Sequence, residues 1–205
     1  MTTVDCLENQ KLHVLQQLFA SATHDASAVM CQWTNSLITL TLDEVCEIPM
    51  EDVCRKLNFG DELLTMVVLT LDGEIGGVMI LTFDEDSGRR LVASLLGEKP
   101  NNGPEWTELE QSALTETGNI LGCAYMNAMT RLINCDLVPS PPYFIQDYGA
   151  SVMQQALLTQ HVNADNVLIC RTVFCHEGEE LSWRMLFVPT AGLRQALEAA
   201  IHSGC

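Results

Sequence analysis

Hydrophobic residues recur at helical spacing along residues 107–134 of the chain. At about 100° per residue, one face of this helix collects the apolar side chains Leu114, Leu121, Tyr125, Ala128 and Leu132. Thr107 and Glu110 have the spacing of a capping box, so the helix is predicted to begin there. Because the apolar face must be buried, we expect this helix to pack on a core.

The opposite face of the same helix carries a row of polar residues. Ser112, Glu116 and Asn119 follow the spacing i, i+4, i+7, which aligns their side chains. Gly118 and Gly122 lie in the helix interior, where each glycine costs about 1 kcal/mol relative to alanine. Either another helix packs closely there, or a bulky partner approaches the backbone beside the polar row. The row itself is compatible with a solvated surface and with a functional site.

A single plan of elements occurs twice in the chain. The first half predicts a helix at 11–34, a strand at 37–42, a short helix after Pro49, strands at 63–71 and 77–83, and a helix at 87–96. After the long helix, the prolines at 139, 141 and 142 interrupt residues 135–147. The second half then predicts a helix at 148–161, strands at 167–175 and 181–188, and a helix at 190–202. An offset of about 100 residues is typical of an internal duplication.

The duplication predicts an α+β fold of pseudo-two-fold symmetry, in which a mostly antiparallel sheet is backed by two long helices. We expect residues 1–205 to form one domain of two repeats, at about 10–97 and about 105–203. A shift of 99 residues places His13, Gln17 and Ala20 at the positions of the polar row. The first repeat therefore has neither the carboxylate nor the amide. If the row is a site, the second repeat alone is expected to retain it.

Composition excludes several classes of function. The 205 residues are 47% hydrophobic and 18% charged, which is typical of a packed globular protein. With 27 acidic and 10 basic residues, the net charge of −17 argues against a nucleic-acid groove and against an anionic membrane surface. A partner protein with a basic patch, or one that brings its own metal ion, is compatible with this charge.

The cysteines and the N-terminus indicate a cytoplasmic protein. The nine cysteines are odd in number and include no C-x-x-C pair, so we expect free thiols rather than disulfides or a zinc site. The chain has no apolar run of membrane-spanning length, and its first residues lack the pattern of a signal peptide. Membrane insertion is therefore not expected.

Four residues carry a resemblance to a known family. Ser112, Glu116, Asn119 and Pro141 are separated by three, two and twenty-one residues. This arrangement resembles the motif of the CheC-type chemotaxis phosphatases, a superfamily that also includes CheX and the phosphatase part of FliY. The resemblance extends to the duplicated layout, and it makes the first repeat, with its Gln17 and Ala20, a degenerate copy.

The resemblance implies hydrolysis of the phospho-aspartate of a CheY-like response regulator. The regulator would supply Mg²⁺, so no metal or cofactor of the protein's own is expected. Asn119 would orient the attacking water and Glu116 would accept a salt bridge from a lysine of the regulator. Supporting roles would fall to Ser112 through a hydrogen bond, to Pro141 by stiffening a loop, and to Gly118 by leaving room for the regulator. The alternative is a non-enzymatic chemotaxis or flagellar-switch adaptor that binds the regulator or a CheD-like deamidase.

Overall fold

The computed structural model describes residues 3–34, 38–56, 63–151, 166–176 and 179–203. Its helices are α1 (Thr3–Trp33), α2 (Val53–Lys56), α3 (Glu85–Leu96), α4 (Glu108–Ile133) and α6 (Ala191–Ser203), with a short 3-10 helix η1 (Met50–Asp52) before α2. Its strands are β1 (Ile38–Pro49), β2 (Leu63–Leu71), β3 (Gly77–Phe83), β4 (Tyr143–Tyr148), β5 (Asn166–His176) and β6 (Glu179–Pro189).

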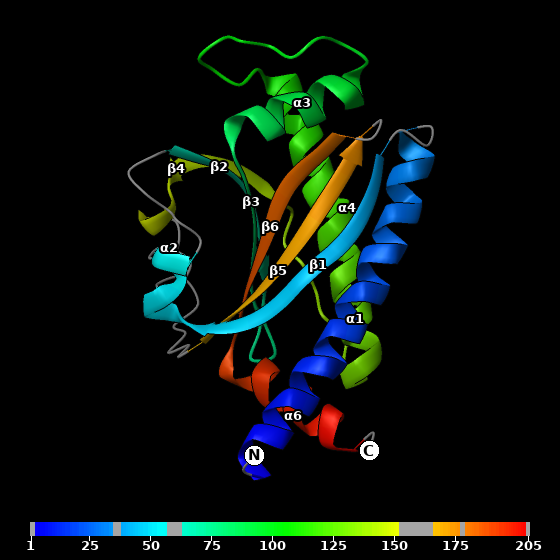
Figure 1. The fold of residues 1–205 in the computed structure, drawn as a ribbon, viewed down its shortest axis with the longest axis vertical. Coiled ribbons are helices and arrows are strands. Elements are labelled where there is room, and N and C mark those ends of the chain that lie inside the picture. The colour runs from blue at the N-terminus through cyan, green and yellow to red at the C-terminus, as the bar shows by residue number, and fades with distance from the viewer. Residues whose placement is uncertain (1–2, 35–37, 57–62, 152–165, 177–178, 204–205) are drawn as a thin grey trace.

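The strands form one antiparallel sheet in the order β1-β5-β6-β3-β2-β4 (Figure 1). Exchanging the first three strands of the chain with the last three reverses this order and leaves it otherwise unchanged. β3 and β6 meet at the centre, where Ile80 lies opposite Leu186, and β1 and β4 form the edges. The expected α+β fold with two-fold layout is confirmed, whereas the bounds of the two repeats stay a prediction.

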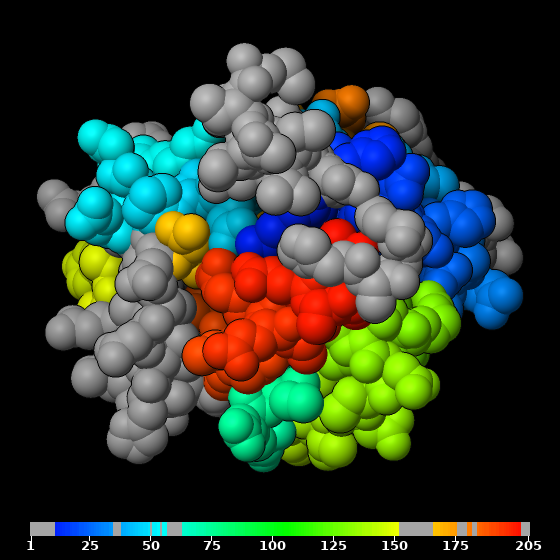
Figure 2. Space-filling model, turned by 90° about the horizontal axis from the view of Figure 1, so that it is seen from below, coloured from blue at the N-terminus to red at the C-terminus, as the bar shows by residue number. Residues whose placement is uncertain are grey.

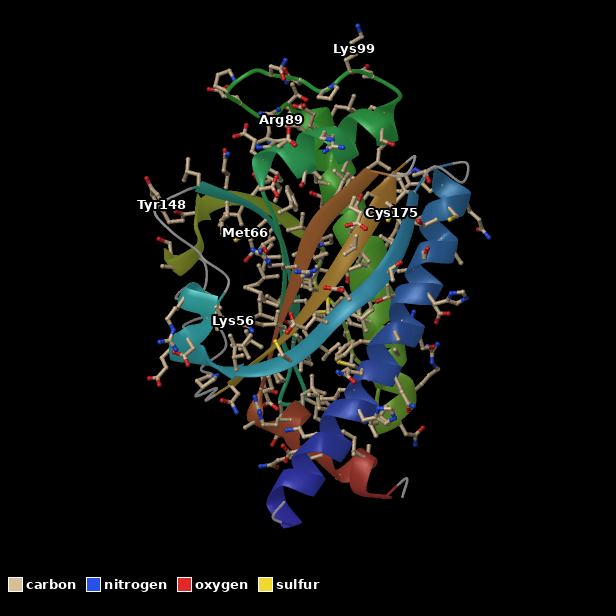
Figure 3. The ribbon with its side chains drawn as sticks, in the orientation of Figure 1. Lys56, Met66, Arg89, Lys99, Tyr148 and Cys175 are labelled. Atoms are coloured by element: carbon tan, nitrogen blue, oxygen red, sulfur yellow. The ribbon has the colours of Figure 1, made fainter. Side chains whose placement is uncertain are left out.

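Helices cover the sheet mainly on one face. α1 and α4 lie side by side there, with α3 and α6 at opposite ends of the molecule (Figure 1). Seen from the α6 end, α6 lies between α1, the end of α4 and the turn that joins β2 to β3 (Figure 2). The main core lies between helices and sheet and includes Phe19, Leu69 and Leu114. A smaller core on the other face contains Met66, which points away from α1 and α4 (Figure 3).

The edge strand β1 is longer than the sequence predicts. Instead of ending at Leu42, it pairs with β5 as far as Pro49, with an irregularity in register between Leu42 and Glu44. The predicted end of this strand at residue 42 is therefore wrong. Continuous pairing to a neighbouring strand overrides the weak strand propensity of the acidic residues in this segment.

The opposite edge strand, β4, was missed altogether. The three prolines of residues 139–142 hide it in the sequence, but all of them precede its first residue, Tyr143. Because β4 is an edge strand, prolines next to it leave the hydrogen bonds of the sheet intact. Of the helix predicted at residues 148–161, residues 149–151 are helical and the remainder from 152 lies outside the described residues. Residues 177 and 178, between the two predicted strands of the second half, also lie outside them.

A buried tyrosine joins both long helices to the sheet. The hydroxyl of Tyr125 in α4 lies 2.6 Å from Thr23 Oγ1 of α1 and 3.1 Å from Thr172 Oγ1 of β5. Thr23 donates its own proton to the carbonyl oxygen of Phe19, so Tyr125 must donate to Thr23 and accept from Thr172. The rings of Phe19 and Tyr125 are 5.4 Å apart. Burial raises the pKa of Tyr125 to about 12, so the phenol remains a donor at neutral pH.

We expect Tyr125→Phe to lower the free energy of unfolding by about 1–3 kcal/mol, because it removes the donor to Thr23 and leaves the buried hydroxyl of Thr172 without its acceptor. Urea denaturation of both proteins measures the difference. Tyr148→Phe is the matched control, because Tyr148 is 48% exposed and its loss should change stability by less than about 0.5 kcal/mol. Equal stability of Tyr125→Phe and the wild type would contradict the role given to this hydroxyl.

Candidate functional site

The first turn of α4 is closed by the predicted capping box. The side chain of Thr107 accepts the backbone N–H of Glu110 at 3.3 Å, and Glu110 Oε2 accepts the N–H of Thr107 at 2.7 Å. At the other end Asn134 adopts the left-handed conformation, with φ of 51°, and caps the helix. Both ends of the long helix are therefore defined by local interactions.

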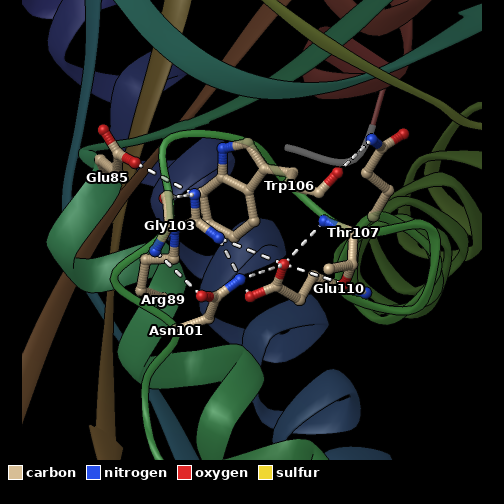
Figure 4. Close-up of polar contacts among 8 residues, drawn as sticks. Glu85, Arg89, Asn101, Gly103, Trp106, Thr107 and Glu110 are labelled. Carbon is tan, nitrogen blue, oxygen red and sulfur yellow. Dashed lines mark hydrogen bonds and ion pairs between the residues drawn. The ribbon is translucent and has the colours of Figure 1, made fainter.

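Glu110 also belongs to a buried ion pair that fixes α4 to α3 (Figure 4). Arg89 Nη1 of α3 donates to both carboxylate oxygens of Glu110, at 3.0 and 3.1 Å. Arg89 donates further to the carbonyl oxygen of Gly103 at 2.9 Å, and its guanidinium lies 3.9 Å from the centroid of the Trp106 ring. Asn101 donates to Glu110 at 3.3 Å. The segment 98–106 is thus attached to both helices.

The charge of Glu110 is maintained by its hydrogen bonds. Burial alone would raise the pKa of this carboxyl group, but donors on Thr107, Asn101 and Arg89 outweigh burial and hold the pKa below its ordinary value. The carboxylate also lies at the N-terminus of α4, where the helix dipole favours negative charge. At neutral pH the ion pair is therefore fully formed.

The polar row lies on the outer surface of α4, as its spacing predicted. Ser112 and Glu116 are exposed, and Asn119 is half-buried. Cys123, one turn further along the helix, donates its thiol proton to Asn119 Oδ1 at an S···O distance of 3.6 Å. The i+4 spacing could have pointed to Cys123 in the sequence, although it was not among the predicted residues.

The two glycines of α4 face the sheet and not the polar row. A Cβ atom at Gly118 would lie 3.0 Å from Val67 Cβ and would overlap Val67 Cγ1. A Cβ atom at Gly122 would lie 2.7 Å from Leu69 Cδ2. The interpretation that Gly118 leaves room for a partner is therefore wrong. Close packing is the reason for the glycines, and the packing partner is strand β2 rather than another helix.

Pro141 lies in the connection between α4 and β4, and this connection is fastened to the end of β2. The N–H of Ser140 donates to the carbonyl oxygen of Thr70 at 2.8 Å, and the N–H of Thr70 donates to Ser140 Oγ at 3.0 Å. Pro139 forms an isolated bridge with Leu71. These contacts give Pro141 a fixed backbone beside the strand on which α4 packs, while its part in the site stays a prediction.

The corresponding face of α1 has a different character. His13, Gln17 and Ala20 are all exposed, and Gln17 Nε2 lies 3.1 Å from His13 Nε2. The two polar side chains are thus engaged with each other, and the third position ends in a methyl group. The position that corresponds to Pro141 falls inside β1. The two long helices therefore present unlike rows to solvent.

Comparison with known proteins places the fold. No protein-family model matches the chain. The CheY-P phosphatase CheC of Bacillus subtilis is 23% identical over 194 residues, which cover 92% of each protein. FliY of Thermotoga maritima has a TM-score of 0.74 at 14% identity, with 95% of this chain and 97% of FliY covered. FliM, in the FliG–FliM complex of H. pylori, has a TM-score of 0.69 at 10% identity, with 92% and 97% covered.

In sequence the chain is similar to CheC-type CheY-P phosphatases, at 22% and 23% identity, and it shares the fold of FliY and of a CheC-like superfamily protein. The described residues include no helix long and apolar enough to cross a membrane. In the same part of the chain, His, Cys, Asp and Glu do not gather in groups of three or more that could hold a metal ion. The polar row of α4 offers one carboxylate, Glu116, and one amide, Asn119.

We expect Glu110→Gln to destabilise the protein by about 3 kcal/mol at neutral pH, because buried Arg89 loses its buried carboxylate and keeps only the more exposed Glu85, at 3.2 Å. The pKa of Glu110 is lowered in the folded state, so the stabilisation is complete above the unfolded value of about 4.3. It is lost as the pH falls through the folded pKa. The difference between wild type and variant should therefore shrink in acid.

Urea denaturation from pH 7 down to about pH 3 tests the behaviour of Glu110. The control is Glu108→Gln, an exposed acid in the same turn, which should change stability by less than about 1 kcal/mol. A gap between wild type and Glu110→Gln that stays constant with pH would contradict the ion pair.

Gly118→Ala should lower the free energy of unfolding by up to about 2 kcal/mol. The new methyl group overlaps Val67, and this overlap of about 1–3 kcal/mol outweighs the gain in helix propensity of about 1 kcal/mol. In a Val67→Ala background, which removes the overlapping methyl groups, Gly118→Ala should cost less stability than it costs in the wild type. A double-mutant cycle of urea denaturation measures this difference. Additive effects of the two changes would rule out the contact.

Proposed function

We propose that this protein hydrolyses the phospho-aspartate of a CheY-like response regulator at the polar row of α4. The observation that carries the proposal is the presentation of Glu116 and Asn119 on the outer face of a fixed helix. The helix packs on β2 through its two glycines, and Tyr125 bonds it to α1. The Arg89–Glu110 ion pair fixes its first turn to α3. The sequence likeness to a CheY-P phosphatase supports the reaction class.

The chemistry proposed for Asn119 is the orientation of water. An acyl phosphate is already activated, so the reaction lacks only a water molecule held in line with the bond to be broken. Positioning of this kind lowers a barrier substantially without covalent participation. A carboxamide carries donors and an acceptor on one rigid group, and half-burial restricts its motion. Asn119 is therefore the residue that we assign to the attacking water.

The role proposed for Glu116 is docking. Its exposed carboxylate lies one turn before Asn119 on the same row and can accept a charge-assisted hydrogen bond from a lysine of the regulator. Ser112, a further turn back, extends the polar contact, and Pro141 borders it. Mg²⁺ prefers several oxygen ligands in octahedral geometry, which the single carboxylate of the polar row does not provide. The metal ion of the reaction is therefore assigned to the regulator.

An adaptor without catalytic activity is the second candidate. The fold likeness to FliM in a complex with FliG favours it, because FliM is an assembly component in that structure. An adaptor would bind the regulator, or a CheD-like deamidase, without shortening the life of the phosphoryl group. Docking through Glu116 serves both functions, whereas an amide that orients water serves the phosphatase alone.

We expect Asn119→Ala to lower the rate of phospho-regulator hydrolysis by about 10²–10³, the usual cost of removing one positioned polar group. The first repeat cannot compensate, because Ala20 stands at the corresponding position. The measurement is the lifetime of CheY-like regulators, phosphorylated with acetyl phosphate, with and without the protein.

Asn127→Ala is the matched control, because Asn127 is an exposed amide on the same helix, about two turns beyond Asn119. It should leave the rate unchanged. Binding of the regulator should persist in Asn119→Ala and weaken in Glu116→Ala, since an interfacial ion pair contributes to affinity. A wild-type protein that binds the regulator and never shortens its phosphorylated lifetime would favour the adaptor, and full activity of Asn119→Ala would end the assignment of this site.

A further inference from the structure

Cys123 connects the main core to the polar row. Its side chain is half-buried and packs against the core between the helices and the sheet. On its other side the thiol reaches Asn119, with 3.6 Å between Sγ and Oδ1. Because the two residues are one turn apart on the same helix, the contact needs no movement of the backbone.

The thiol is held in its protonated form. Burial, and then the negative charge of Glu116, raise the pKa of Cys123 above its ordinary value. At neutral pH the sulfur therefore keeps its proton and acts as a donor. A protonated, half-buried thiol is also a weak nucleophile, so direct attack on a phosphoryl group is not its chemistry.

The contact decides which way the carboxamide of Asn119 faces. The oxygen and nitrogen of an amide lie on opposite sides of the Cβ–Cγ axis, and the two ends are alike in size. With Oδ1 turned toward Cys123, the NH₂ group must point away from it. One lone pair of Oδ1 and both N–H donors remain available to a water molecule.

We propose that Cys123 is a positioning residue for Asn119. Its S–H group fixes one of the two flip states of the carboxamide, and this state is the one that orients the attacking water. The inference rests on the proposed phosphatase function. It adds a fifth residue to Ser112, Glu116, Asn119 and Pro141, and it assigns to that residue an effect on turnover rather than on docking.

Two substitutions test the role of the thiol. Cys123→Ala removes the donor, and Cys123→Ser replaces it with a hydroxyl group. Cys135→Ala is the control, because Cys135 is a half-buried thiol beyond the end of α4. The readouts are kcat and KM, measured with a CheY-like regulator whose phosphorylated lifetime the wild-type protein shortens. Urea denaturation of each variant establishes that it is folded.

We expect Cys123→Ala to lower kcat about fivefold, in keeping with the loss of one neutral hydrogen bond, and to leave KM within about twofold. Cys123→Ser and Cys135→Ala should both stay within about twofold of the wild type in kcat and KM. The side-chain NH₂ resonances of Asn119, assigned by their loss in Asn119→Ala, should shift in Cys123→Ala and not in Cys135→Ala.

Three outcomes would overturn the inference while the phosphatase assignment stands: unchanged kcat in Cys123→Ala, equal losses in the alanine and serine variants, or an effect confined to KM. Asn119 resonances that do not respond to Cys123→Ala would overturn it without any measurement of activity. A wild-type protein that hydrolyses no phospho-regulator would overturn the proposed function, and the inferred role in turnover with it.

Discussion

The close approach of α4 to β2 fixes the geometry on which the rest of the site depends. Gly118 and Gly122 place the helix backbone against Val67 and Leu69, with no side chain of the helix between them. At about 100° per residue, a helix that turns these glycines to the sheet must turn Asn119 to its flank and Glu116 to solvent. Their half-buried and exposed environments agree with this rotation. The contact with β2 thus sets the direction in which the polar row faces.

The two long helices differ in a complementary way. At an offset of 99 residues, the two glycines of α4 correspond to Phe19 and Thr23 of α1. Phe19 packs its ring on Tyr125, and Thr23 accepts the hydroxyl proton of the same tyrosine. Both ends of the helix layer are held by charged side chains as well: Arg89 with Glu110 at one end, and Lys11 with Glu47 and Glu198 at the other. We therefore interpret α1 as a helix that supports α4, whereas α4 bears the polar row.

The sequence predicted the elements with strong local signals and missed those that depend on tertiary contacts. The capping box at Thr107 and the apolar face of α4 were readable because capping and helical periodicity act within a few residues. The strand β4 was hidden by neighbouring prolines and exists because β2 pairs with it. The sites of close packing at Gly118, and the burial of Trp106 over Arg89, depend on residues distant in the chain. In the candidate site, helical spacing predicted the polar row of α4. It did not predict which way the glycines face or that Cys123 contacts Asn119.

A protein that acts by positioning alone depends on the placement of its helix as much as on the groups that the helix carries. A misplacement of about 1 Å can cost a factor of about 10² in rate when catalysis comes from orientation. Gly118, Tyr125 and Glu110 lie outside the polar row, yet they determine where it stands. Gly118 sets the distance of the helix from the sheet, Tyr125 its rotation about its axis, and Glu110 the position of its first turn. Consider a chain with the same four motif residues on a helix that packs less closely on its sheet. It would keep the carboxylate for docking, but the orientation of its amide would no longer be fixed. The same fold can therefore serve a phosphatase and an adaptor, and we expect the difference to lie as much in the residues beneath the helix as in the motif on its surface.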